Sequence, residues 1–251
     1  MNNFNAIEAK NECVAWIRDW FEHNGKDCNA IIGISGGADS SIVAALCVEA
    51  LGKERVIGIM MPDGHQADLE DSLKLCNFLD IKSEIINIGP TIDVLISHLY
   101  SVIVPSQQTR INLPPRVRMT TLYAISQSKN GRVANTCNLS EDYIGYSTRW
   151  GDSVGDFSPL ANFTKTEVVA IGDACGLPRE LTHKTPSDGL CGKTDEDNFG
   201  FTYEVLDKYI RTGECEDEIV KEKIDKLHTQ NLFKMKPIAS FGFWWRKFYE
   251  N

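Results

Sequence analysis

Short apolar segments alternate with helical patterns along the first half of the chain. Strand-like runs are expected at residues 30–34, 56–61, 84–88 and 132–136, with apolar residues at helical spacing before and between them. Strands that are apolar on both faces need helices on both faces, as in parallel sheets. The pattern therefore predicts one α/β domain over residues 1–251, built on a doubly wound parallel sheet with flanking helices.

Prolines and capping residues mark the ends of further helices. Pro114 and Pro115 suit the first turn of a helix, where a missing N–H costs no hydrogen bond. Thr164 and Glu167 have the form of a capping box at another helix start. Residues 185–200 are polar and lack periodicity, so a long loop is expected there, with two short helices after it.

Composition limits the classes of partner. The 251 residues include 26 Lys and Arg against 35 Asp and Glu, a net charge of −9 that disfavours nucleic acid as the main partner. No apolar run approaches the ~18 residues that span a bilayer, and the N-terminal residues do not resemble a signal peptide. The eight cysteines form no C-x-x-C pair and are expected to be reduced thiols. We expect no nucleic-acid partner, no membrane partner and a cytoplasmic location.

The most specific local pattern lies between the first strand and its helix, where residues 33–41 read GISGGADSS. Glycines let successive backbone N–H groups converge, and a helix N-terminus adds a partial positive charge, so the loop can hold a phosphate chain. The motifs of P-loops and dinucleotide-binding Rossmann folds are absent. Asp39 would repel phosphates unless Mg²⁺ lay between them. A tight turn with Asp39 as a helix-start carboxylate is the alternative.

The S-G-G-x-D-S string at residues 35–40 resembles the pyrophosphate loop of the ATP pyrophosphatase, or PP-loop, superfamily. The resemblance implies an adenine nucleotide alpha hydrolase-like fold that cleaves ATP between its α and β phosphates, with ATP as co-substrate and Mg²⁺ as cofactor. The residues that it implies for ATP binding here are Gly33, Ile34, Ser35, Gly36, Gly37, Ala38, Asp39 and Ser40.

Downstream segments resemble the NAD synthetase family over nearly the whole chain from Gly33 onward. They read NLPPRVRM at residues 112–119, TCNLSE at 136–141, YSTRWGDSVGD at 146–156, LANFTKTEV at 160–168 and PSDGL at 186–190. Four positions depart from the family pattern: Pro115 replaces alanine, Asn135 replaces glycine, Arg149 replaces lysine, and Thr229 replaces the lysine of a His-Lys pair.

The resemblance implies a role for each matching residue. ATP binding extends to Thr136, Lys165 and Ser187, and Mg²⁺ falls to Asp39 and Glu141, although Glu141 taken alone is more typical of a helix start. The implied catalytic residues are Asp39, Lys165 and Asp156, with Asp152 or Asp156 as a proton acceptor from ammonium. The implied contacts to deamido-NAD⁺ are Arg116, Arg149, Asp152, Asp156, His228 and Thr229, with Lys234 or Lys236 as a substitute for the missing lysine.

The implied activity is ammonia-dependent NAD⁺ synthesis. ATP adenylates the nicotinate carboxylate of deamido-NAD⁺, and ammonia then displaces AMP, giving NAD⁺, AMP and diphosphate. No glutaminase domain is expected within 251 residues, so free ammonia is the expected nitrogen source. The family also implies a homodimer, for which the apolar residues 95–104 and 119–125 are candidate interface, although they equally suit a core.

Two alternatives remain open at this point. A tRNA-modifying ATP pyrophosphatase would share the glycine loop, but it should also show a basic face or a catalytic C-x-x-C pair. A non-catalytic adenine-nucleotide sensor would bind ATP through the same loop without turnover, and it would have little need for Glu141, Arg116 and Asp156 together.

Overall fold

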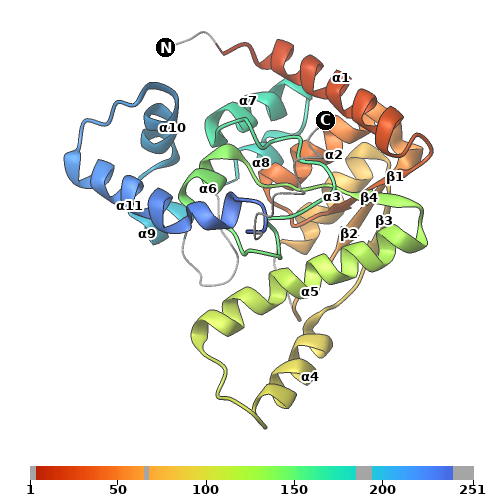
Figure 1. Cartoon of the computed structure of the whole chain (residues 1–251). Helices are drawn as coiled ribbons and strands as arrows, with labels where there is room; N and C mark the ends of the chain where they lie inside the picture. The colour runs from red at the N-terminus through yellow and green to blue at the C-terminus, as the bar shows by residue number, and fades with distance from the viewer. Residues whose placement is uncertain (1–3, 65–67, 185–193, 240–251) are drawn as a thin grey trace, which may run out of the picture.

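A parallel β-sheet lies at the centre of the computed structural model, which describes residues 4–64, 68–184 and 194–239 (Figure 1). Within those residues the sheet has four strands in the order β3-β2-β1-β4, and every neighbouring pair is parallel. The strands are β1 (Asn29–Gly33), β2 (Val56–Met60), β3 (Lys82–Ile85) and β4 (Gly131–Val133). The glycine loop follows β1, which pairs on both edges.

Helices cover both faces of the sheet. Successive side chains of β1 point to opposite faces, so neighbouring residues of this strand pack against different helices. Ile32 packs with α1 (Ala6–Asn24), α2 (Ala38–Leu51), α3 (Leu69–Leu79) and α7 (Lys165–Ala174). Ile31 packs with α4 (Gly89–Leu99) and α5 (Gln107–Ser128). This two-sided packing confirms the predicted doubly wound α/β fold.

A third apolar cluster joins helices beyond the sheet. It contains Ile144, Phe199, Leu206 and Ile224. These residues come from α6 (Leu139–Ile144), α9 (Asp195–Phe199), α10 (Tyr203–Thr212) and α11 (Glu218–Met235). The two short remaining elements are η1 (Lys53–Arg55) and α8 (Arg179–Thr182). The third cluster brings the last part of the described chain beside the loops that follow the strands (Figure 1).

Three expectations from the sequence need correction. Pro114 and Pro115 lie inside α5, which starts at Gln107 after the cap Ser106. A proline removes the hydrogen bond of its own nitrogen, and the rest of this long helix still forms. Asp195–Phe199 forms α9 where a loop was expected, and the expected loop at 185–193 lies outside the described residues. The last described helix, α11, has 18 residues and is therefore not short.

The described residues also bear on membrane insertion and thiol chemistry. Within residues 4–64, 68–184 and 194–239, no helix combines the length and the hydropathy that crossing a bilayer requires. The seven described cysteines are all free, and Cys47 and Cys76 are buried.

Candidate active site

The glycine loop between β1 and α2 is shaped by one residue with a left-handed backbone. Gly36 has φ +81°, and a Cβ there would lie 2.4 Å from the carbonyl oxygen of Asp68. Serine side chains close the loop: the Oγ atoms of Ser35 and Ser40 are 3.1 Å apart, and the Gly37 N–H donates to Ser35 Oγ at 3.2 Å. The loop therefore requires glycine at position 36 and places hydroxyls beside its backbone.

Three charged side chains meet where α2, α6 and α7 begin. Lys165 Nζ lies 2.5 Å from Asp39 Oδ2 and 3.5 Å from Glu141 Oε1. The Lys165 side chain is only 7% exposed, and the carboxylates are 17% and 14% exposed. The structure thus brings together the glycine-loop carboxylate and the two residues singled out in later segments.

Helix starts position all three of these side chains. Asn138 caps α6 by accepting from the Glu141 N–H at 3.0 Å, and its side-chain amide donates to Asp39 Oδ1 at 3.4 Å. Lys165 is the first residue of α7, after Thr164, whose N–H donates to Glu167 Oε2 at 2.8 Å as the sequence predicts. The capping contacts therefore link two helix N-termini to the end of the glycine loop.

The cluster perturbs the protonation of its own members. Burial and, next, the nearby charge of Asp39 raise the pKa of Glu141 to about 8, although Lys165 opposes the rise. Burial alone would lower the pKa of Lys165, but the charges of Asp39 and Glu141 outweigh burial and raise it. The Lys165 ammonium therefore stays charged at neutral pH. The Glu141 carboxyl loses its proton less readily than an exposed glutamate does, unless a further cation binds beside it.

Several residues to which the sequence assigns no role support this cluster. Lys165 Nζ lies 5.5 Å from the centre of the Tyr203 ring, and the Tyr203 hydroxyl donates to Asp195 Oδ2 at 3.2 Å. Ser140 Oγ accepts from the Lys165 N–H at 3.0 Å and donates to Asp207 Oδ1 at 2.5 Å. Only Asn138 carried a local signal, because Asn-x-x-Glu is a capping pattern.

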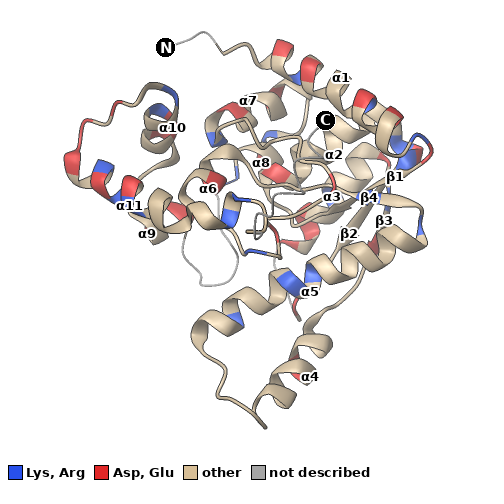
Figure 2. Ribbon diagram, in the orientation of Figure 1, with Lys and Arg blue, Asp and Glu red and all other residues tan. Residues whose placement is uncertain are grey.

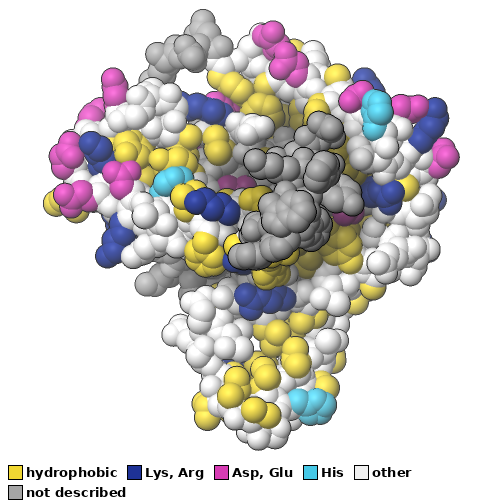
Figure 3. Space-filling model, viewed as in Figure 1, with side chains coloured by type: hydrophobic (Ala, Val, Ile, Leu, Met, Phe, Trp, Pro, Cys, Tyr) yellow, Lys and Arg dark blue, Asp and Glu magenta, His cyan; other side chains and the backbone are white. Residues whose placement is uncertain are grey.

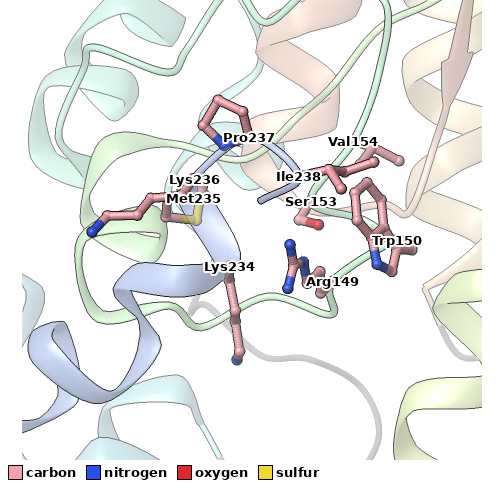
Figure 4. Close-up of a pocket in the computed structure, with 9 residues that line it drawn as sticks. All are labelled: Arg149, Trp150, Ser153, Val154, Lys234, Met235, Lys236, Pro237 and Ile238. Carbon is pink, nitrogen blue, oxygen red and sulfur yellow. The ribbon is translucent and has the colours of Figure 1, made fainter. Parts of the chain in front are cut away.

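A second group of predicted residues lies beside α5 and α11. Arg116 Nε, on α5, donates to the carbonyl oxygen of Arg149 at 3.2 Å, and Asp152 Oδ1 accepts from the Thr148 N–H at 2.9 Å. Arg149 and Lys234 line the same cavity of about 380 Å³ (Figure 4). The Lys234 ammonium itself points away from Arg149 (Figure 4) and donates to the carbonyl oxygens of Gly145 at 2.7 Å and Ser147 at 3.2 Å.

The other predicted contacts have different surroundings. His228 Nδ1 lies 2.7 Å from the carbonyl oxygen of Tyr143, and its ring stacks on that of Tyr143 with centroids 4.1 Å apart. Thr229 is exposed on α11. Neither residue lines the cavity that Arg149 and Lys234 share.

Asp156 and Thr136 lie at the end of β4. Asp156 Oδ2 accepts from the Val133 N–H at 2.7 Å, and Oδ1 accepts from the Tyr123 hydroxyl at 3.2 Å. Thr136 is partly buried in the segment between β4 and α6. Ser187 lies outside the described residues.

The carboxylates at this edge of the sheet determine which metal ion could bind there. Among the residues that the structure describes, no group of three or more His, Cys, Asp or Glu side chains has the geometry of a metal site. Asp39 and Glu141 provide two carboxylates beside one cation. Two carboxylates completed by phosphate oxygens are the usual protein environment of Mg²⁺ with a nucleotide.

Comparisons with known proteins agree on one family. The NAD synthase family model matches residues 9–241. An NH(3)-dependent NAD(+) synthetase of Thermococcus sibiricus is 40% identical over 211 residues, covering 84% of this chain and 82% of the relative. The solved structure of an NMN synthetase from Francisella tularensis has a TM-score of 0.89 at 31% identity, covering 96% of this chain and all 100% of that one.

An NH3-dependent NAD synthetase from Campylobacter jejuni has a TM-score of 0.77 at 29% identity, covering 95% of this chain and 99% of that chain. The family model spans nearly the entire described chain, and the similarity includes the glycine loop and the segments around Glu141 and Lys165. This chain belongs to the NAD synthase family.

Proposed function

We propose that the chain is an ammonia-dependent NAD⁺ synthetase, a ligase that forms a C–N bond. Membership of the NAD synthase family supports this activity and disfavours the tRNA-modifying alternative. The observation that carries the proposal is the buried Lys165 between Asp39 and Glu141, directly beside a glycine loop at the end of a central strand. A protein that only senses a nucleotide has little need for this cluster.

The proposed reaction has two steps. A nicotinate carboxylate oxygen of deamido-NAD⁺ attacks the α phosphorus of ATP, and diphosphate leaves. The nitrogen of ammonia then attacks the acyl carbon, AMP leaves, and a carboxylate takes the proton. The protein mainly positions two anionic substrates and stabilises charge, which is how preorganised cations and N–H groups lower such barriers.

Individual residues take the following proposed roles. The N–H groups of residues 33–40 hold the ATP phosphates with Thr136, Lys165 and Ser187. Lys165 stabilises the charge that develops at the α phosphate. Arg116 and Arg149 meet the anionic groups of deamido-NAD⁺, and Lys234 or Lys236, which both line the cavity beside Arg149, supplies a further cation. Asp156 or Asp152 accepts the proton from ammonium.

Mg²⁺ fits the donor set of the cluster. Asp39 and Glu141 would hold the ion, since their carboxylate oxygens already face one cation, Lys165. When bound, Mg²⁺ supplies neutralisation of the phosphate charge. Lys165 is charged whether or not Mg²⁺ is bound, so its ammonium can pair with a phosphate oxygen.

The test is a product assay. Purified protein is incubated with ATP, Mg²⁺, deamido-NAD⁺ and ammonium, with glutamine replacing ammonium in a parallel sample. Equal amounts of NAD⁺, AMP and diphosphate with ammonium, and almost none with glutamine, are expected. AMP without NAD⁺ would mean a different acceptor or nitrogen donor, and intact ATP would favour the sensor alternative.

A second candidate acceptor is nicotinate mononucleotide. It is supported by the similarity to the NMN synthetase of Francisella tularensis, whose TM-score exceeds that of the Campylobacter NAD synthetase. The chemistry would be the same, because the nicotinate carboxylate is present in both acceptors. Competition between equal amounts of deamido-NAD⁺ and nicotinate mononucleotide, followed by chromatography of NAD⁺ and nicotinamide mononucleotide, identifies the preferred substrate.

A homodimer and a cytoplasmic location complete the proposal. Val102 and Val104 are 80% and 83% exposed in the segment between α4 and α5, and Val94 is 58% exposed on α4. Figure 2 shows little charge on α4, and Figure 3 shows hydrophobic side chains gathered on this projection. An exposed apolar patch supports a subunit interface. Light scattering should give the mass of two chains, and Val102→Asp should give one.

A further inference from the structure

Arg118 lies on α5 and uses only part of its hydrogen-bonding capacity. Its Nε donates to the carbonyl oxygen of Met61 at 3.0 Å. Within residues 4–64, 68–184 and 194–239, no hydrogen bond or ion pair involves its two terminal nitrogens. The N–H groups on those nitrogens can only donate, so they remain available to a ligand that carries acceptor oxygens.

The course of α5 places Arg118 beyond the carboxyl end of the central strand. Ser126 lies at the start of β4, where a Cβ on Gly131 would come 3.3 Å from Ser126 Cα. Leu122 lies at the end of β1, where a Cβ on Gly33 would come 3.3 Å from Leu122 Cδ1. Arg118 is one further turn along the same helix face, so it lies where the glycine loop leaves the sheet.

Two carboxylates lie near this guanidinium, one at each neighbour of β1. Asp63 follows β2, and Asp152 lies beside the end of β4, where its carbonyl oxygen accepts from Asn135 Nδ2 at 2.8 Å. Burial lowers the pKa of Arg118, and the nearby charges of Asp63 and Asp152 oppose the fall. These carboxylates keep the guanidinium charged and leave its terminal N–H groups free in the described part of the chain.

The catalytic cluster reaches the same edge from the other face of the sheet. Asp39 and Lys165 lie in the first turns of α2 and α7, which pack on the face that carries Ile32. The helix that carries Arg118, α5, packs on the face of Ile31 (Figure 1). A group that reacts at the end of β1 therefore has Lys165 on one side and Arg118 on the other.

The geometry of displacement at phosphorus gives the two cations different tasks. The attacking and leaving oxygens lie roughly in line, on opposite sides of the phosphorus. Because the proposed function puts the ATP phosphates on the glycine loop and Lys165, the acceptor carboxylate approaches from the side of Arg118. A guanidinium forms two parallel N–H···O contacts with a carboxylate, which fixes the plane of the carboxylate as well as its position.

We propose that Arg118 is a catalytic residue that binds the nicotinate carboxylate of the acceptor through its terminal N–H groups. One carboxylate oxygen forms the new bond to the α phosphorus, and diphosphate leaves with the electrons of the broken P–O bond. Arg118 keeps its contact with the other oxygen, which becomes the acyl oxygen. This inference rests on the proposed function and assigns a residue to its reacting group.

The same contact serves the second step. When the nitrogen of ammonia bonds to the acyl carbon, an electron pair of the C=O bond moves to the oxygen that faces Arg118. Donors that are already in place stabilise such an oxyanion. The pair then returns, the bond to AMP breaks, and Asp152 or Asp156 takes the proton that nitrogen loses.

The first test compares deamido-NAD⁺ with NAD⁺, which differ by a carboxylate in place of an amide. Calorimetry of the full chain without ATP measures both affinities. Arg118→Met should weaken binding of deamido-NAD⁺ about tenfold or more, because charge-assisted hydrogen bonds are lost. Binding of NAD⁺ should change by less than about twofold, because an amide offers no charge to the guanidinium. Arg118→Lys should restore only part of the difference, because an ammonium lacks the planar pair of donors.

The second test is turnover. The kcat of Arg118→Met should fall about 100-fold, with KM for ATP changed by less than about threefold. Arg55→Met is the control, since Arg55 also donates to a main-chain carbonyl oxygen, that of Cys28 at 2.7 Å, but at the amino end of the sheet. It should leave kcat and both affinities within about twofold of the wild type. Urea midpoints confirm that each variant is folded.

Equal losses of affinity for deamido-NAD⁺ and NAD⁺ in Arg118→Met would overturn the proposal, because a residue that only ties α5 to β2 cannot distinguish a carboxylate from an amide. Full turnover in that variant would overturn it as well. If the wild-type chain binds deamido-NAD⁺ but forms no NAD⁺, the proposed function fails, whereas the ratio of the two affinities still decides the role of Arg118. Absence of deamido-NAD⁺ binding to the wild type would overturn both.

Discussion

Lys165 Nζ lies 2.5 Å from Asp39 Oδ2, and this contact joins the N-terminus of α7 to the N-terminus of α2 across the end of the sheet. The pair is largely buried, and Glu141 shares the same ammonium. Buried ion pairs are costly to break, because the remaining charge has lost both its partner and its water. Lys165 therefore couples the stability of the fold to the chemistry proposed for the site.

Replacing Lys165 by methionine should reduce both stability and turnover. We expect Lys165→Met to lower the free energy of unfolding by about 3 to 5 kcal/mol, since it leaves Asp39 and Glu141 without their cation. The kcat should fall by about 10²- to 10³-fold. Urea unfolding and the product assay measure the two effects. Lys165→Arg, which keeps the charge, should recover more stability than activity, and an unchanged urea midpoint in Lys165→Met would contradict the structure.

Glu141→Gln should separate nucleotide binding from turnover. The glutamine oxygen can still accept from the Asn138 N–H, so the helix cap survives, but one Mg²⁺ ligand charge is lost. The dissociation constant for ATP should change by less than about threefold, whereas kcat should fall at least about 100-fold. The Mg²⁺ concentration that gives half-maximal activity should rise. Glu180→Gln, at an exposed residue on α8, is the control. Retention of full activity by Glu141→Gln would remove Glu141 from the proposed metal site.

Stability without divalent cations should depend on pH through two carboxyls. Burial raises the pKa of Glu141 from 4.5 to about 8, and burial raises that of Asp142 from 3.8 to about 6. In each window the folded state binds more protons than the unfolded state, so the free energy of unfolding falls as pH rises. Above both pKa values the penalty is complete.

Urea unfolding in EDTA from about pH 5 to about pH 8 measures this dependence. Glu141→Gln should flatten the decline up to about pH 8, whereas Asp142→Asn should flatten only its part below about pH 6. Parallel curves for the wild type and Glu141→Gln would show that Glu141 titrates normally.

The sequence predicts well that two carboxylates meet at one edge of the sheet, for a simple physical reason. Asp39 and Glu141 each follow a strand, and parallel strands bring their carboxyl ends to one edge. Thr164 and Glu167 mark the start of α7, which brings Lys165 to that edge. The helix start and the meeting of the carboxylates depend on a local pattern and on a topology rule, whereas the role of Lys165 is implied only by the resemblance to the NAD synthetase family.

The surroundings of the cluster are not predictable in this way. Tyr203 and Asp195 reach Lys165 from a segment whose path depends on the packing of the third apolar cluster. Lys234 lies six residues after His228, which is about 9 Å further along a helix. No sequence spacing shows which of these positions lines the cavity beside Arg149, because that depends on how α11 packs.

The proline positions show a similar limit. Pro114 and Pro115 are typical of a helix start, yet α5 begins directly after its cap Ser106, which lies eight residues before Pro114. The Ser106 Oγ accepts from the Thr109 N–H at 3.1 Å. A cap supplies an N–H partner at the first turn, whereas a proline only lacks a donor. The capping signal therefore predicts the start of this helix better than the prolines do.

Lys184 should control the affinity for ATP from outside the catalytic cluster. Its Nζ donates to Asp71 Oδ2 at 2.8 Å, to Asp68, and to the carbonyl oxygen of Gly36 at 3.4 Å. One ammonium thus ties the glycine loop to the start of α3. Lys184→Met leaves the two carboxylates near the phosphate loop without this cation, so ATP should bind more weakly.

We expect Lys184→Met to raise KM for ATP about tenfold and to change kcat by less than about threefold, because the groups at the reacting phosphate stay in place. The matched control is Lys74→Met, since Lys74 pairs with the same Asp71 from the exposed side, 59% exposed, and contacts no glycine-loop atom. Initial rates at varied ATP, with deamido-NAD⁺ and ammonium saturating, measure both constants. Equal KM values in the two variants would mean that the Gly36 contact has no part in holding the loop, whereas a loss confined to kcat would place Lys184 among the groups that act on the reacting phosphate.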